Sequence, residues 1–425
     1  MNRHHRSLRG ATALAATVYA LLNGSLAGAQ AVVDIRMERD TVSARSRPGF
    51  ESQGRAFGGF KLQPSVTVAT LATDNLYARR DVKVSDVSVS VQPALSLQSQ
   101  WAKHALNLSA SATVDRHPSH SIENIERFEM AGDGRIDAGT GTHITAEAGF
   151  ARRIEPRGTT GDTLFGAKPI AYTLLTGGLG FEQEFGRTRL SLTGQYERYR
   201  YLDRRLGNVV IDQSARDFES VTGDVRLAQA VSPGIAVFAD ASLSHNRYPV
   251  KIDGLNRNST GVTALGGVLF GISRLLQGEI GAGYLRQTFK DPVFPTISGF
   301  DYHVHVRWSP TRMTDVRLFA ARSFQRSPIA NIAGVEQQDI VLAVEHELRR
   351  NILLRPGASY TTAKFRGSER RDHFAEVHFG VAWFVNRHLE IDGTVAHGLG
   401  RNNVPTAWAR EYDQNRATLG ITWRL

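Results

Sequence analysis

Residues 300–308 read Phe-Asp-Tyr-His-Val-His-Val-Arg-Trp, and this stretch decides the fold. Aromatic or aliphatic side chains occupy its even positions, whereas an acid, two histidines and an arginine occupy its odd positions. Because successive side chains of a β-strand point to opposite faces, a period of two predicts a strand with one apolar and one polar face. A helix would instead need a period of about 3.6, which this stretch lacks.

The same alternation recurs along the rest of the chain in segments of about ten residues. We count eighteen such segments, and the pattern fits 16–18 strands. The least regular segment is 126–138, where Gly132 and Gly134 interrupt the apolar face. The segments are 60–71, 84–98, 104–114, 126–138, 142–154, 170–185, 188–201, 215–231, 235–247, 260–273, 277–289, 299–308, 313–324, 337–348, 351–363, 373–385, 388–398 and 414–425.

The connections between these segments alternate in length. Short ones, such as 232–234 and 309–311, alternate with long ones, such as 155–169 and 202–214. Short turns at one end and long loops at the other are typical of outer-membrane barrels. After residue 29 no apolar run approaches the ~20 residues of a spanning helix, and an open sheet cannot cross lipid. Residues 60–425 are therefore predicted to form an all-β, transmembrane, antiparallel up-and-down barrel, with a soluble sandwich or propeller as the alternative.

The first 29 residues have the three parts of a secretory signal peptide. Arg3, Arg6 and Arg9 precede a short apolar stretch, and Ala27-Gly28-Ala29 fits an A-x-A cleavage site. We expect cleavage after Ala29. Residues 30–59 are polar and basic, which predicts a flexible periplasmic extension, with docking to a partner as the alternative.

The composition excludes several classes of protein. The chain has no cysteine, so it can have no disulfide, no cysteine-ligated zinc and no thiol nucleophile. Fifty-one Lys and Arg exceed 41 Asp and Glu, but they are scattered and the chain carries an export signal, which argues against nucleic acid as a partner. The expected anionic partners are lipid and lipopolysaccharide of a bacterial outer membrane.

The polar parity of the strands predicts the residues that line the lumen. The signs are mixed, which predicts a wet, polar lumen, although Asp or Glu paired with Arg could equally brace the wall. The predicted lumen-lining residues are Asp224, Arg226, Asp240, Glu279, Asp301, His303, His305, Arg307, Asp315, Arg317, Asp339, Glu345, Glu347, Arg355, Glu376, His378, Glu390 and Asp392.

Two histidines on one face of a strand, His303 and His305, lie near Asp301 and could serve catalysis or bind a metal. The sequence supplies no nucleophile motif, no third ligand at a telling spacing, no P-loop and no dinucleotide fingerprint. We therefore expect no enzyme activity, no cofactor and no metal.

Two further features bear on assembly and transport. Leu419, Ile421, Trp423 and Leu425 alternate with polar or small residues at the C-terminus, as in the terminal strand that barrel assembly machinery reads. A general diffusion porin would usually fold a constriction loop into its lumen. The best candidate for such a loop is 155–169, with Glu155, Arg157 and Asp162.

The start of the predicted barrel resembles the family named "Putative beta-barrel porin 2". The resemblance rests on Gln63-Pro64, Asp74-Asn75-Leu76-Tyr77, Ser85-Asp86, Val91-Gln92-Pro93-Ala94-Leu95, Trp101-Ala102-Lys103-His104 and Glu155-Pro156-Arg157-Gly158. Such proteins are often encoded with exopolysaccharide synthesis and export systems. The resemblance implies a pore that passes a polysaccharide chain across the outer membrane alongside a periplasmic polysaccharide export protein. A general diffusion porin and a closed structural or adhesin barrel are the alternatives.

Overall fold

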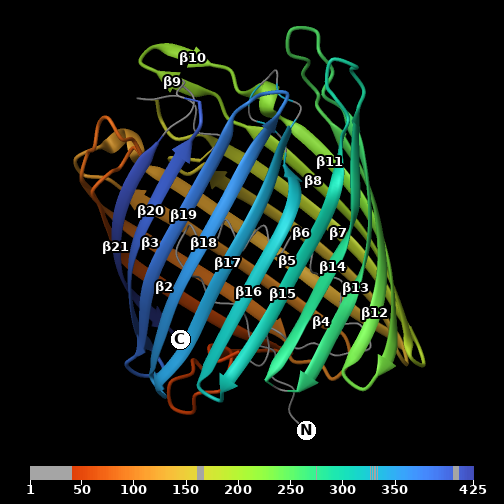
Figure 1. Cartoon of the computed structure of the whole chain (residues 1–425). Helices are drawn as coiled ribbons and strands as arrows, with labels where there is room; N and C mark the ends of the chain where they lie inside the picture. Colours follow the sequence, from red (N-terminus) through yellow and green to blue (C-terminus); the bar gives the residue numbers. More distant parts are fainter. Residues whose placement is uncertain are drawn as a thin grey trace.

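The computed structural model describes residues 41–159, 167–273, 275–325, 327, 329, 332, 334–404 and 411–425. Each of the eighteen predicted segments is a strand, and together they close one antiparallel barrel (Figure 1). The barrel strands are β2 (Phe60–Thr73), β3 (Asp86–Ser99), β4 (Ala105–Arg116), β5 (Ile125–Gly139), β6 (Thr142–Ile154), β7 (Ala171–Phe185), β8 (Thr188–Tyr201), β11 (Phe218–Ser232), β12 (Ile235–Arg247), β13 (Ser259–Ser273), β14 (Leu276–Phe289), β15 (Ile297–Thr311), β16 (Thr314–Gln325), β17 (Gly334–Arg349), β18 (Ile352–Arg366), β19 (Arg371–Phe384), β20 (Leu389–Asn402) and β21 (Tyr412–Arg424).

Closure is made by the first and last barrel strands. β2 pairs with β3 on one side and with β21 on the other, so that Val68 lies opposite both Val91 and Ile421. Every barrel strand thus has two neighbours, which satisfies backbone groups that lipid could not. A strand spacing of ~4.8 Å and a tilt of about 40° give eighteen strands a backbone radius of about 18 Å. A barrel of this size leaves room for an aqueous lumen.

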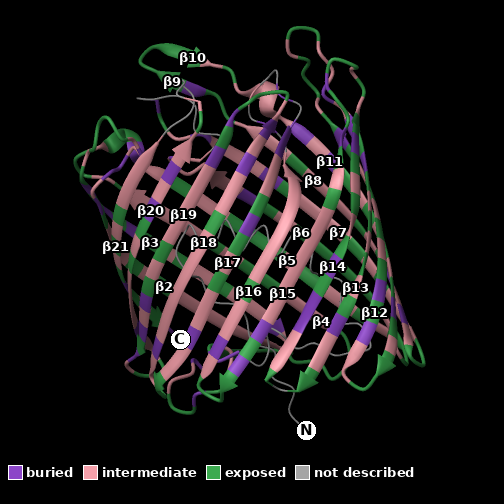
Figure 2. Ribbon diagram, viewed as in Figure 1, coloured by how far each residue is buried: buried purple, intermediate pink, exposed green. Residues whose placement is uncertain are grey.

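Side chains alternate between the two faces of the wall, and the ribbon in Figure 2 is banded accordingly. On β3, Val87, Val89 and Val91 are exposed, whereas Ser88 and Ser90 between them are buried. The exposed apolar face suits lipid, and the opposite face lines the lumen. No helix among the described residues is long and apolar enough to cross a membrane.

The two ends of the barrel differ as predicted. Short turns join the strands at one end, and three of them use Gly141, Gly186 or Gly234 at a positive φ that disfavours other residues. Long loops gather at the other end (Figure 1). They carry the short helices η1 (Ser121–Glu123) and η2 (Ser214–Arg216) and the hairpin of β9 (Arg204–Leu206) and β10 (Val209–Ile211). We call these the short-turn end and the long-loop end.

The N-terminal part holds two features that alternation did not predict. A three-residue strand, β1 (Arg55–Phe57), turns back to pair with the start of β2. Residues 41–54, which we call the strap, precede β1 and contact the inner wall, as described below. The predicted signal peptide, residues 1–29, lies outside the described residues.

Candidate functional site

The inner wall of the barrel is the candidate site, and strand register fixes which residues face it. The strap contacts Asp315, Glu345 and Leu353 from within, and these contacts identify the inner face of β16, β17 and β18. Residues that lie opposite one another on neighbouring strands face the same side of the wall, so the pairing extends this assignment around the sheet. All eighteen residues of the predicted lumen set occupy inner-face positions.

Four of these residues form one charged cluster across neighbouring and more distant strands. Arg226 on β11 lies 2.7 Å from Asp240 on β12 and 3.1 Å from Glu279 on β14. His303 on β15 lies 2.7 Å from the same Glu279. The guanidinium of Arg226 also stacks over the ring of Phe238, at 4.6 Å. One cation therefore compensates two carboxylates, which braces this part of the wall.

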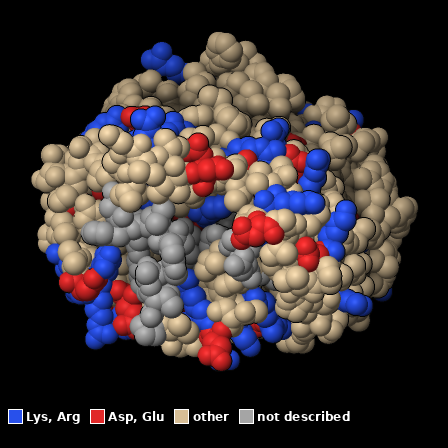
Figure 3. All heavy atoms as spheres, turned by 90° about the horizontal axis from the view of Figure 1, so that it is seen from above, with Lys and Arg blue, Asp and Glu red and all other residues tan. Residues whose placement is uncertain are grey.

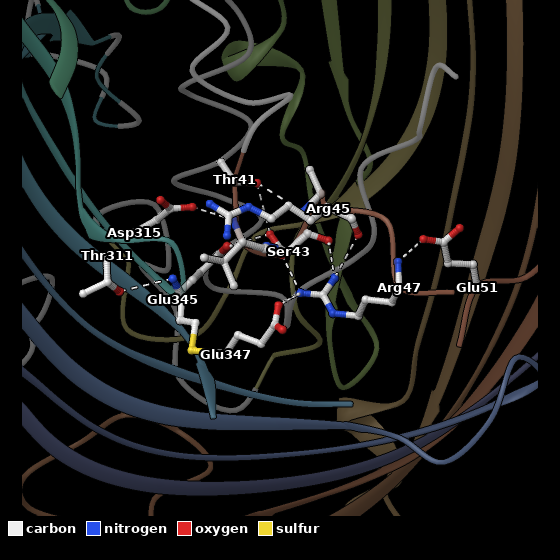
Figure 4. Close-up of polar contacts among 12 residues, drawn as sticks. Thr41, Ser43, Arg45, Arg47, Glu51, Thr311, Asp315, Glu345 and Glu347 are labelled. Atoms are coloured by element: carbon white, nitrogen blue, oxygen red, sulfur yellow. Dashed lines mark hydrogen bonds and ion pairs between the residues drawn. The ribbon is translucent and has the colours of Figure 1, made fainter. Parts of the chain in front are cut away.

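A second charged cluster lies near the short-turn end, and residues of the strap form part of it. Arg317 lies 2.6 Å from Glu345 on the adjacent strand. The other oxygen of Glu345 accepts hydrogen bonds from the backbone N–H (2.9 Å) and the hydroxyl (2.7 Å) of Ser43. The backbone N–H of Val42 donates to Asp315. Figure 4 shows the strap inside the barrel, with these carboxylates turned toward it.

Apolar packing and a further ion pair complete the docking of the strap. Val42 is fully buried against Leu353, Ala382 and Phe384 of the wall. Arg47 lies 3.4 Å from Glu347 and 5.4 Å from the centre of the Phe384 ring. Burial lowers the pKa of Arg47, and Glu347 and Glu345 nearby oppose this effect. The strap is thus held by both charge and apolar contact at the short-turn end of the lumen.

The strap also touches the other end of the chain. The hydroxyl of Ser52 donates to the backbone oxygen of Leu425, and the backbone N–H of Leu425 donates to Pro64 at 3.2 Å. Arg424 pairs with Glu390 on the neighbouring strand. Strap, first strand and last strand therefore meet at the closing seam of the barrel.

Other predicted lumen residues lie apart from these two clusters. Asp339 accepts hydrogen bonds from Thr361 at 2.6 Å and from Gln337 at 2.8 Å. Glu376 pairs with Arg416, and His378 lies 3.8 Å from Glu376. Arg307 donates to Gln277 at 2.9 Å.

The remaining five predicted residues make other contacts. The backbone N–H of Tyr302 donates to Asp301 at 3.0 Å, and His305 lies edge-on to Phe319. Asp224 is within hydrogen-bonding reach of Ser242. Arg355 and Asp392 interact electrostatically across β18 and β20. Within the described chain no group of three or more potential metal ligands comes together. His303 contacts Glu279 and stacks against the ring of Phe238.

The predicted constriction loop is tied to its neighbours at the long-loop end. Arg157 lies 2.5 Å from Glu123 of η1, and Glu155 lies 2.8 Å from Arg216 of η2. These two residues therefore link three mouth loops. Asp162, the third residue of this prediction, lies outside the described residues. Figure 3 shows basic and acidic side chains interspersed around this mouth.

An uncharged patch on the inner face of β11 to β14, at the long-loop end, escaped the sequence analysis. Ser220 donates to Asn246 at 2.9 Å, and Gln287 donates to Ser259 at 2.7 Å. The patch borders a small cavity beside Tyr248. Short hydroxyl side chains are common on any barrel wall. In the sequence, the only sign of this patch is that the inner-face positions at the ends of four successive strands are all uncharged.

The terminal strand places its apolar residues outward. Leu419, Ile421 and Trp423 are each about half exposed on the outer face of β21, beside the first strand. The apolar side chains of the closing seam therefore face the lipid side of the wall.

Comparison with solved structures gives weak likenesses to other outer-membrane barrels. The siderophore receptor PirA from Pseudomonas aeruginosa matches with 10% identity and a TM-score of 0.43, over 88% of this chain and 81% of its own. The outer membrane protein OpdK from Pseudomonas aeruginosa matches with 10% identity and a TM-score of 0.45, over 86% and 99%. The FrpB iron transporter from Neisseria meningitidis matches with 8% identity and a TM-score of 0.45, over 85% and 81%. Likenesses this weak carry no information about the substrate of this chain.

The sequence comparisons give a clearer result. No curated protein matches this chain. The family described as "Putative beta-barrel porin 2" matches residues 47–425, which span the end of the strap and the whole barrel. The chain therefore belongs to this family and is a porin-like outer-membrane β-barrel.

Proposed function

We propose that this barrel is the pore through which an exopolysaccharide chain leaves the cell across the outer membrane. The observation that carries the proposal is the character of the lumen wall, which is largely polar and pairs many of its charges with opposite charges nearby. Arg226 with Asp240 and Glu279, and Arg317 with Glu345, are examples.

Such a wall suits a hydroxyl-rich chain. Paired charges and hydroxyls offer hydrogen-bond donors and acceptors to sugar hydroxyl groups. A pore that selects small ions usually presents a ring of one sign instead. The resemblance to proteins encoded with exopolysaccharide export systems supports the same choice, and the aqueous bore of an eighteen-stranded barrel leaves room for an extended glycan.

The proposal also orients the molecule and names its surroundings. The short-turn end, with both termini of the barrel, would face the periplasm, as in other outer-membrane barrels. A periplasmic polysaccharide export protein would deliver the chain there, beside the strap. Lipopolysaccharide would surround the long-loop end, and the terminal strand with Leu419 and Ile421 would be read by the barrel assembly machinery. No nucleic acid and no cofactor enters this scheme.

Reconstitution tests the proposal. Purified protein is inserted into liposomes loaded with a labelled disaccharide and a labelled neutral polysaccharide, and the efflux of each is followed. We expect both sugars to leave, with faster polymer efflux from a Glu345→Gln variant, because its strap is held more weakly. If the disaccharide leaves the liposomes while the polymer is retained with both the wild type and the variant, the proposal is contradicted and a diffusion porin is supported. Retention of both would favour a closed barrel.

A further inference from the structure

The uncharged patch at the long-loop end encloses a cavity of about 200 Å³. Its lining comes from four successive strands, β11 to β14, together with two aromatic side chains beyond them. The lining residues are Ser220, Thr222, Ser244, Asn246, Tyr248, Ser259, Gly261, Thr263, Leu285, Gln287, Phe289 and Phe324. None of these twelve is charged, although the wall below them is rich in ion pairs.

A connected set of hydroxyls and amides forms the floor of the cavity. Ser220 donates to Asn246 at 2.9 Å, Asn246 donates to Ser259 at 3.4 Å, and Gln287 donates to Ser259 at 2.7 Å. An amide presents two donors and one acceptor with two lone pairs, and a hydroxyl presents both functions. The Oε1 oxygen of Gln287 and the hydroxyl of Ser244, which also lines the cavity, therefore leave capacity for a ligand that carries several hydroxyl groups.

The missing side chain of Gly261 leaves room for the side chains of Gln287 and Ser244. A methyl group at Gly261 would lie 2.2 Å from Oε1 of Gln287 and 2.6 Å from Oγ of Ser244. No other residue could occupy this position without displacing both side chains. The absence of a side chain at residue 261 thus lets Gln287 reach over the floor to Ser259.

Aromatic rings stand on both sides of the polar floor. Tyr248 packs against Phe218 with ring centres 6.0 Å apart, and Arg257 covers it at 4.2 Å. On the other side Phe289 packs against Phe294 at 5.8 Å and Phe324 at 6.3 Å. The guanidinium of Arg257 also donates a hydrogen bond to the backbone oxygen of Ala215.

We infer that this cavity is a binding subsite for an uncharged sugar ring of the transported chain. A pyranose ring presents hydroxyl groups around its edge and C–H groups on its faces, so it matches a polar floor between aromatic walls. None of the lining residues is charged, which favours a neutral ring over an acidic one, since a carboxylate would gain no cation from the lining to offset its lost hydration. Arg257, the cation beside the lining, covers the ring of Tyr248. The subsite lies at the exit end of the lumen. It would hold the chain weakly as it leaves.

The choice of a sugar as the ligand rests on the proposed function. The subsite is tested by measuring how strongly added sugars block the ion current through the pore. Full-length protein in planar bilayers is titrated with maltohexaose as the neutral probe and with hexagalacturonic acid as the acidic one. We expect maltohexaose to block the current, and Gln287→Leu, Asn246→Leu and Gly261→Ala each to weaken this block about 2- to 10-fold, as the loss of one or two hydrogen bonds requires. Gln98→Leu, on the inner face of β3, is the matched control and should leave the block unchanged.

Two results would overturn the subsite: equal block of the wild type and all three cavity variants, or block by the acidic hexamer at least as strong as by the neutral one. Folding of each variant is checked by its basal conductance, so that a misfolded barrel is not mistaken for a lost site. The subsite and the export function fail separately. If the cavity variants weaken the block while deletion of the protein leaves secretion unchanged, the subsite stands and export falls. If deletion abolishes secretion while the variants leave the block unchanged, export stands and the subsite falls.

Discussion

Glu345 binds the strap through two hydrogen bonds, and its substitution by Gln gives the sharpest prediction. Its carboxylate accepts two hydrogen bonds from Ser43 while pairing with Arg317. The Gln amide keeps the shape but loses the charge. Hydrogen bonds to a charged group contribute roughly 1.5–3 kcal/mol and neutral ones roughly 0.5–1.5 kcal/mol.

The structure gives the size of the expected effect. One amide oxygen can still accept from Ser43, so we expect a loss of about 1–2 kcal/mol in the free energy of strap docking. A change of this size raises the ratio of undocked to docked strap by about 5- to 30-fold. The remaining contacts of Val42 with the wall keep most molecules docked.

Cysteine labelling measures that ratio directly, because the chain has no cysteine of its own. Val42 is fully buried when the strap is docked, so a Val42→Cys side chain reacts with a water-soluble maleimide only from the undocked state. Labelling of Val42→Cys with Glu345→Gln should therefore be about 5- to 30-fold faster than labelling of Val42→Cys alone.

A matched control removes the same charge elsewhere on the lumen wall. Glu376→Gln loses the pairing with Arg416. Glu376 lies on β19, several residues along the strand from Ala382 and Phe384, which contact the strap, so this change should leave the labelling rate unchanged. The reasoning is refuted if Glu376→Gln speeds labelling as much as Glu345→Gln does. It is also refuted if Val42→Cys labels rapidly in the otherwise unaltered protein.

Three further predictions concern the wall, a mouth loop and the seam. Arg226→Leu leaves Asp240 and Glu279 without their shared cation. The unfolding free energy, measured by heat-dependent gel mobility, should therefore fall by about 1–3 kcal/mol, and the pore should become more cation-selective, as measured by reversal potential. An unchanged reversal potential would argue against a shared cation. Burial raises the pKa of Asp74, but hydrogen bonds from the backbone and side chain of Asn415 outweigh it and leave the pKa below its ordinary value. This contact therefore stabilises the start of the loop 74–85 above about pH 4 and is lost as the pH falls through the lowered pKa. Hydrogen exchange of that loop should rise on acidification in the wild type and depend much less on pH in Asp74→Asn, and equal pH dependence would contradict the assignment. Ile421→Arg puts a charge on the lipid face at a cost of about 2–4 kcal/mol, whereas Thr422→Arg points into the lumen, so only the former should deplete assembled barrel in outer-membrane fractions.

Local alternation was sufficient to predict every barrel strand, because the period of two depends only on adjacent residues. Even the segment 126–138 is a strand, β5, in spite of Gly132 and Gly134. The positions of polar residues such as Asp240 and Glu345 on the inner face follow from the same parity. Strand ends were less predictable: β17 begins at Gly334 and β20 runs to Asn402, beyond the regular part of each pattern.

What the sequence could not supply are contacts between residues far apart in the chain. Arg226 reaches Glu279 across two intervening strands because the barrel wall curves, and no spacing in the sequence encodes that curvature. Ser43 meets Glu345 from a polar stretch whose composition is typical of a flexible leader. The uncharged cavity is likewise a product of register, since Gly261 matters only because Gln287 lies beside it.

The central claim is export of a polysaccharide, and one measurement on a deletion strain tests it most directly. Secreted and periplasmic exopolysaccharide are quantified separately in the wild type, in the deletion strain and in the complemented strain, with uptake of a small solute followed in parallel. The account predicts that secreted polymer falls, that periplasmic polymer accumulates, and that complementation reverses both. Unchanged secretion together with reduced uptake of the small solute would contradict the account and identify the protein as a diffusion porin.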